Sequence, residues 1–155
     1  MRLRDEVLHL VEHNLHAELN ALVTRRPRAL RFLLGLSYSA DAEVRRCANA
    51  ALARGGRSHP NLVQNIVRRL VWAMNDESGT NALTAPAVVA AIAEEDPTLL
   101  LPMLPDLIRL CGDETLRPDL ARALRLVSSG CPGRVGHALQ DQLNKQLERG
   151  CHRDF

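Results

Sequence analysis

The chain has 155 residues, of which 46% are apolar and 25% are charged, a balance that excludes a disordered protein and is typical of a globular one. The net charge is only +2, but residues 1–75 hold 12 basic and 6 acidic side chains while residues 76–155 hold 8 and 12. With four aromatic residues in all, the core must be built from Leu, Val, Ile and Ala, which suit helix packing.

The first predicted element is one amphipathic helix over residues 4–23, within an N-terminal cap that we place at 1–24. Apolar residues recur there at helical spacing, at Leu8, Val11, Leu15, Leu19 and Leu22. Charged residues interrupt this segment every few positions, which argues against a signal peptide and against a membrane span. We therefore expect a cytoplasmic protein with no membrane partner.

The next segment, 27–56, is predicted to form a helical hairpin. Pro27 suits the first turn of a helix that carries Leu30 to Leu36. Asp41 can accept a hydrogen bond from a free amide and so cap a second helix over 42–54, which Gly55-Gly56 would end.

Two more hairpins and a last helix are predicted after it. Segment 61–95 pairs a helix over 61–74 with one over 81–94, and Pro86 should kink that second helix or delay its start. Segment 97–130 pairs 98–111 with 114–129, and the segment 133–150 holds a C-terminal cap helix. The prediction is an all-α chain of about eight helices.

A repeated phrase fixes how these hairpins are related. Asp41-Ala-Glu-Val-Arg45 recurs as Asp113-Glu-Thr-Leu-Arg117, and a degenerate copy begins at Asp76, so the three aspartates are 35 and 37 residues apart. That spacing is the length of one helical hairpin. Apolar residues stand at equal offsets from the three aspartates. Nine positions before them are Phe32, Val67 and Leu104, and five positions before them are Leu36, Val71 and Ile108. Seven positions after them are Ala48, Leu83 and Leu120, and eleven positions after them are Leu52, Ala87 and Leu124. We expect one domain over 1–155, a right-handed α-solenoid (α-α superhelix) whose hairpins stack through these stripes.

The repeats resemble short HEAT repeats of the kind found in lyase-like bacterial families. Residues 99–127, LLLPMLPDLIRLCGDETLRPDLARALRLV, are similar to the family pattern in a proline-interrupted first helix, an Asp turn, an apolar-Arg pair and Ala-Leu. Residues 41–55, DAEVRRCANAALARG, match its second helix. Residues 71–86, VWAMNDESGTNALTAP, resemble a segment of uncharacterised bacterial HEAT-like proteins, and depart from the repeat at Gly79 and Thr80. The resemblance covers about residues 27–130 and implies a fold, with no activity attached.

The aspartates and arginines that recur in the repeat are interpreted as structural residues. Arg45 and Arg117 each stand four residues after an aspartate, where a guanidinium could bind the aspartate of a neighbouring repeat bidentately. We predict a ladder of Asp41, Arg45, Asp113 and Arg117 that orients successive turns, so that replacing Asp41 lowers stability. No catalytic residue is assigned.

Three histidines could bind a metal. His9, Glu12 and His13 spell an inverted zinc-protease motif, and His16 adds a third imidazole on the same flank of the predicted helix. The alternative, solvated histidines on a cap helix, is preferred, because a metalloprotease needs a further ligand and a large cleft. The four cysteines are far apart and are interpreted as reduced structural thiols, and we expect no cofactor.

A polar cluster follows the single tryptophan. Trp72 with Asn75, Asp76, Glu77 and Ser78 is either a core tryptophan followed by a turn or a recognition spot for a partner, since tryptophan beside polar residues is typical of interaction hot spots. The central hairpin, where the repeat phrase is least regular, is where we look for a particular function.

The function we expect is a non-catalytic scaffold or adaptor that binds another protein. A nucleic-acid-binding protein is the alternative, because ten arginines of the N-terminal half could gather into one basic surface: Arg25, Arg26, Arg28, Arg31, Arg45, Arg46, Arg54, Arg57, Arg68 and Arg69. Scarce aromatic residues count against it. A third class is a lyase-like or cofactor-handling accessory protein, and the sequence leaves open whether two copies pair as a homodimer.

Overall fold

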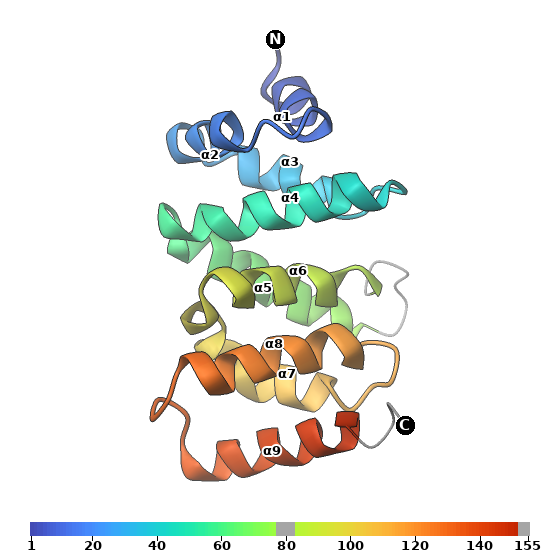
Figure 1. Ribbon diagram of the computed structural model, residues 1–155, viewed down its shortest axis with the longest axis vertical. Helices are drawn as coiled ribbons and strands as arrows, with labels where there is room; N and C mark the ends of the chain where they lie inside the picture. The colour runs from blue at the N-terminus through green and yellow to red at the C-terminus, as the bar shows by residue number, and fades with distance from the viewer. Residues whose placement is uncertain (77–82, 152–155) are drawn as a thin grey trace.

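The computed structural model describes residues 1–76 and 83–151, and within these ranges it contains helices and no strands (Figure 1). The described part has nine α-helices and two 3₁₀ segments, η1 and η3: α1 (Leu3–Glu12), α2 (His16–Arg25), α3 (Ala29–Leu36), α4 (Ala42–Arg54), η1 (Gly55–Arg57), α5 (Pro60–Asn75), α6 (Ala85–Glu95), η3 (Pro97–Met103), α7 (Leu104–Leu110), α8 (Arg117–Gly130) and α9 (His137–Cys151). Among these helices none is both long and apolar enough to cross a bilayer.

The helices follow one another along the long axis of the molecule, from α1 at one end to α9 at the other (Figure 1). Each predicted hairpin forms, because α3 contacts α4, α5 contacts α6, and α7 contacts α8. Helices α4, α6, α8 and α9 contact one another in chain order and make one layer. Helix α5 packs on η3 and α7 in a second layer. The core fills the space between the layers and includes the fully buried Leu52, Ile92, Leu107 and Leu124.

The N-terminal cap is two helices, where we predicted one over 4–23. Helix α1 ends at Glu12, and Asn14 takes a left-handed conformation with φ of 53°. The amide of Leu15 donates to the carbonyl of Leu10 at 3.0 Å, and that of Asn14 donates to Val11 at 3.2 Å. These two bonds are a Schellman motif, in which asparagine is the residue other than glycine that best tolerates the left-handed position. The hydrophobic spacing continues through the break, so periodicity alone does not reveal it.

The segment of the first predicted hairpin contains α3 and α4, which contact each other. Helix α4 spans Ala42–Arg54, as predicted, and Asp41 is its N-cap. Gly55 and Gly56 were predicted to end the helix through the conformational freedom of glycine. That reason was wrong, because both have ordinary backbone angles, and both are buried. A Cβ on Gly55 would lie 2.7 Å from Cδ2 of Leu30, and one on Gly56 would lie 2.7 Å from Cδ1 of Leu99. The glycines therefore let the end of α4 approach α3 and η3 closely.

The second helix of the central hairpin starts late. Helix α6 begins at Ala85, and Pro86 lies in its first turn, where its missing N–H costs nothing. Of the two outcomes predicted for Pro86, the delayed start is the one observed. Leu83, which we assigned to the buried stripe by its offset, precedes the helix and is 62% exposed, so that assignment was wrong. Gly79 and Thr80 lie outside the described residues.

The first helix of the third hairpin is divided. A 3₁₀ segment, η3, leads into α7, where we predicted a single helix over 98–111. Asp96 begins the segment, since its carboxylate accepts from the amide of Thr98 at 3.1 Å. Pro102 and Pro105 then remove backbone donors at neighbouring turns, which explains the short, tightened helices.

Candidate interaction surface

Trp72 lies on the outer face of α5 and is 72% exposed. The buried row of the same helix is formed by Val63, Val67, Leu70 and Met74. At about 3.6 residues per turn, Trp72 is roughly half a turn away from that row and points away from the core. The prediction of a core tryptophan is therefore wrong, and the alternative of a recognition spot remains.

The polar residues after Trp72 have separate roles. Asn75 donates from Nδ2 to the carbonyl of Val71 at 3.0 Å, and its Oδ1 accepts from Nη1 of Arg109 at 2.9 Å. Arg109 also pairs with Asp106 at 2.9 Å, so this group joins α5 to α7. Asp76 is the C-cap residue of α5. Glu77 and Ser78, the other members of the predicted cluster, lie outside the described residues.

An open groove of about 200 Å³ lies between α3 and α5, and we call it the α3–α5 groove. Its apolar lining comes from both helices, with Leu30 and Leu34 on one side and Leu62 and Ile66 on the other. Its remaining lining residues are Pro27, Arg31, Asn65 and Arg69. This groove was not predicted from the sequence. The signal that could have indicated it is the outer row of α5, where Leu62, Asn65, Arg69 and Trp72 recur at helical spacing.

The ten arginines of the predicted basic surface do not gather in one place. Arg46 and Arg57 form ion pairs with Glu43 and Glu95. Arg45 and Arg54 are partly buried and are held by Ser39 O and Asn20 Oδ1. The exposed arginines of α3 and α5, with Arg28 just before α3, are different, because in the described part of the chain no carboxylate forms an ion pair with them: Arg28, Arg31, Arg68 and Arg69.

A second cleft, of about 300 Å³, lies across α4, α6 and α8. Its lining includes Ala50, Ala87 and Ala91. Its charged residues have partners inside and outside the cleft, since Arg46 pairs with Glu43, Glu95 pairs with Arg57, and Arg45 donates to the carbonyl of Ser39. Arg122 pairs with Glu94 and, at 3.3 Å, with Asp119. The charges of this cleft are therefore largely neutralised within the molecule, in contrast to those beside the α3–α5 groove.

The arginines of the repeat phrase bind backbone carbonyls within their own hairpins. Nη1 of Arg45 donates to the carbonyl of Ser39 at 2.6 Å, and Nε of Arg117 donates to that of Cys111 at 2.9 Å. Both carbonyls lie six residues upstream, in the arginine's own hairpin. The predicted bidentate pairing with the aspartate of a neighbouring repeat is not what the structure shows. The guanidinium instead binds a backbone carbonyl just after the first helix, since Ser39 lies in the turn that follows α3 and Cys111 is the C-cap residue of α7.

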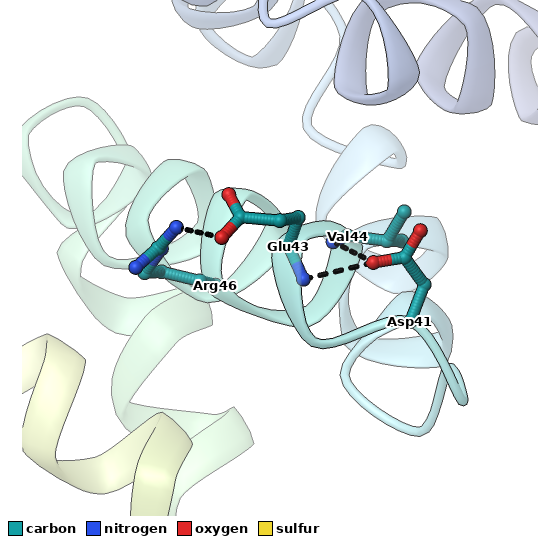
Figure 2. Close-up of polar contacts among 4 residues, drawn as sticks. All are labelled: Asp41, Glu43, Val44 and Arg46. Atoms are coloured by element: carbon teal, nitrogen blue, oxygen red, sulfur yellow. Dashed lines mark hydrogen bonds and ion pairs between the residues drawn. The ribbon is translucent and has the colours of Figure 1, made fainter.

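The aspartates of the phrase also differ from a uniform ladder. The carboxylate of Asp41 accepts from the amides of Glu43 and Val44 at 2.9 and 3.4 Å, and Figure 2 shows this cap beside the Glu43–Arg46 ion pair. Asp113 accepts from the amide and the hydroxyl of Thr115, and these bonds lower the pKa of its carboxyl. Asp113 therefore orders the turn before α8, whereas Asp41 caps a helix directly.

The structure separates the three histidines that were predicted to share one flank of a helix. The break at Asn14 places His9 and His13 on or next to α1, and His16 at the start of α2. The rings of His9 and His13 have centroids 4.3 Å apart, whereas Nδ1 of His16 lies 4.0 Å from Sγ of Cys47. Within residues 1–76 and 83–151, no three His, Cys, Asp or Glu side chains come close enough to hold one metal ion.

The described thiols are structural. Cys47, Cys111 and Cys131 are free and buried. Burial raises the pKa of the Cys47 and Cys111 thiols, which keeps them protonated and unreactive near neutral pH.

Comparison of the chain with protein-family models, with curated proteins and with solved structures gives no match. The resemblance to HEAT repeats therefore remains a prediction from the repeated phrase.

Proposed function

We propose that this chain is a non-catalytic scaffold that binds another protein, built as a right-handed α-solenoid of HEAT-like repeats. Two observations support the architecture. The hairpins follow one another in chain order, and the arginines at equal offsets in two copies of the phrase bind carbonyls at equal distances along the chain. Repeats of this kind form extended surfaces that serve recognition.

The observation that carries the binding function is the exposure of Trp72. A single exposed apolar side chain is ordinary on a protein surface. Tryptophan and arginine, however, are the residue types most enriched at interaction hot spots, and Trp72 lies one turn beyond Arg69 on a helix rich in exposed arginine. A large ring held outward by a rigid helix is pre-organised for contact.

The test is quantitative capture from extracts of the native organism. Wild-type protein, Trp72→Ala and Trp72→Phe are used as bait, with Arg134→Ala, an exposed residue of the α8–α9 turn, as the control. We expect at least one protein to be captured by the wild type and the control, to be lost with Trp72→Ala, and to be partly retained with Trp72→Phe. If every captured protein binds Trp72→Ala as well as it binds the wild type, the proposal is wrong.

Nucleic-acid binding is the second candidate, and the unpaired arginines beside the α3–α5 groove favour it. They would contact phosphates, and affinity would then fall steeply as salt is raised. Stacking of bases needs aromatic faces, and the exposed aromatic residues in the described ranges are Trp72 and Tyr38. Mobility-shift experiments with mixed-sequence DNA and RNA at low salt distinguish the two, since a scaffold for proteins leaves their mobility unchanged. The accessory class predicts a co-purifying pigment, metal or small ligand.

A further inference from the structure

We infer that the α3–α5 groove, together with Trp72, binds an acidic segment of a partner protein that carries apolar side chains. This inference rests on the proposed scaffold function and assigns it a place and a partner chemistry.

The size of the groove favours a peptide over a small molecule. Its volume of about 200 Å³ is below the range of about 300–1,000 Å³ that is usual for small-molecule pockets. A groove between two helices suits a few side chains of a segment that lies along it, as when an amphipathic helix places its apolar face in a groove. Leu62, at 43% exposed, and the half-buried Leu34 give such side chains an apolar floor.

The charge beside the groove favours an acidic segment. Between Leu19 and Asn75 the chain has ten arginines and two carboxylates, and neither carboxylate belongs to α3 or α5. Arg31 and Arg69 line the groove. Arg28 and Arg68 are close to them in the chain and exposed, and Nη1 of Arg68 donates to Oδ1 of Asn65 at 2.7 Å. In the described structure these guanidinium groups have no ion-pair partner. In the α4–α6–α8 cleft, by contrast, Arg46 pairs with one carboxylate and Arg122 with two. Carboxylates of a partner could bind the guanidinium groups beside the α3–α5 groove, each through two hydrogen bonds.

The aliphatic floor favours a protein over a nucleic acid. A nucleic acid would meet the arginines through its phosphates but would place polar sugars or bases over Leu30, Leu62 and Ile66, which are not stacking surfaces. An acidic amphipathic segment satisfies both the arginines and the leucines. Trp72 is outside the lining of the groove but lies one turn past Arg69 on the same helix, where its exposed ring could serve a segment that extends along α5 as an aromatic anchor.

The experiment uses the full chain and a displayed library of random peptides of about 16 residues, long enough for roughly four helical turns. Peptides selected on wild-type protein are synthesised and titrated against wild type, Arg31→Glu, Arg69→Glu, Leu62→Asp and the control Arg134→Glu. We expect the selected peptides to hold more Asp and Glu than Lys and Arg, and to contain Leu, Ile or Phe. We also expect each groove variant to weaken binding by about tenfold or more, and Arg134→Glu to leave it unchanged.

Peptides without an acidic bias, or with unchanged affinity for Arg31→Glu and Arg69→Glu, would overturn the inference. DNA or RNA binding that is lost with the same two variants, in the absence of acidic peptides, would overturn it in favour of a nucleic-acid surface. A wild-type dimer that Arg69→Glu converts to a monomer would overturn it in favour of a second copy of this chain. The scaffold proposal is separable: a Trp72-dependent partner that tolerates both charge reversals removes the groove assignment and leaves that proposal standing.

Discussion

Single polar side chains hold the turns between helices in this molecule. Asp41 caps α4 directly, whereas Asp113 orders the turn before α8 through Thr115. Arg45 and Arg117 bind backbone carbonyls that follow the first helix of their hairpin, those of Ser39 and Cys111. These side chains satisfy backbone groups, so we expect their removal to change stability and to leave partner binding unchanged.

Removing the cap of α4 should destabilise the fold. Asp41→Ala leaves two amides without their acceptor, and we expect the free energy of unfolding to fall by about 1 kcal/mol. Glu43→Ala is the control, because its ion pair with Arg46 is exposed on both sides and is worth roughly 0.5 kcal/mol or less. Urea unfolding followed by circular dichroism measures both. Equal losses for the two variants would contradict the capping role.

The two repeat arginines should differ in their contribution to stability. Arg117 is 8% exposed and donates to the carbonyls of Cys111 and Gly112, whereas Arg45 is half-buried and donates to Ser39. Removing a charged donor from a buried acceptor costs about 1.5–3 kcal/mol. We expect Arg117→Ala to lower the free energy of unfolding by about 2 kcal/mol, and Arg45→Ala to lower it by less. The reverse order in urea unfolding would contradict this.

The carboxyl of Asp113 should make stability depend on pH in the acid range. Its pKa is lowered in the folded state, chiefly by the Thr115 hydroxyl and amide, so the unfolded chain binds the proton more tightly. The stabilisation is present above the unfolded pKa of about 3.9 and is lost as pH falls through the lower folded value. We expect the difference in unfolding free energy between wild type and Asp113→Asn to shrink as pH is lowered from about 5. A difference that is constant over that range would contradict the assignment.

At the scale of whole elements, backbone chemistry sets where helices begin and end. Prolines stand in the first turn of α5, α6 and η3, and Asp41 precedes α4. Each of these starts is a local property, and the sequence predicts it to within a few residues. The break after α1 is local too, but its signal is one asparagine in an otherwise continuous apolar pattern, which is why the prediction of a single helix failed.

The break between α1 and α2 should tolerate glycine and little else. Asn14→Gly keeps the left-handed position without strain, so we expect the free energy of unfolding to change by less than about 0.5 kcal/mol. Asn14→Ala places a Cβ there and should cost about 1 kcal/mol. Thermal unfolding of the two variants measures the difference. A fully neutral Asn14→Ala would show that the Schellman motif does not hold this turn.

For the molecule as a whole, the question is which surfaces the stacked helices leave uncovered. Leu124 is fully buried between the layers and Trp72 is outside them. We therefore expect Trp72→Ala to change the free energy of unfolding by less than about 0.5 kcal/mol and Leu124→Ala to lower it by about 2–5 kcal/mol. Urea unfolding tests both. A loss from Trp72→Ala comparable to that from Leu124→Ala would place the ring in the core and remove it from the proposed surface.

The candidate surface was predictable in part. The sequence singled out Trp72 and its polar neighbours, and the outer row of α5 was readable from helical spacing. The groove could not be predicted from the sequence. Its existence depends on the distance between α3 and α5 and on how each is rotated about its axis, and these helices lie in different hairpins. A gathering of ten arginines into one basic surface was the alternative that their number suggested. The structure instead distributes them, since several have carbonyl or carboxylate partners close by.

The sequence by itself determined the all-helical chain, the three hairpins and their order, because caps, prolines and apolar periodicity act within a few residues. Only the tertiary structure decided that Trp72 faces outward, that Arg45 and Arg117 bind carbonyls, and that the arginines of α3 and α5 lie beside an apolar groove. The physical reason is that the rotation of a helix about its axis, and the partners of its polar groups, depend on which neighbouring helices cover it.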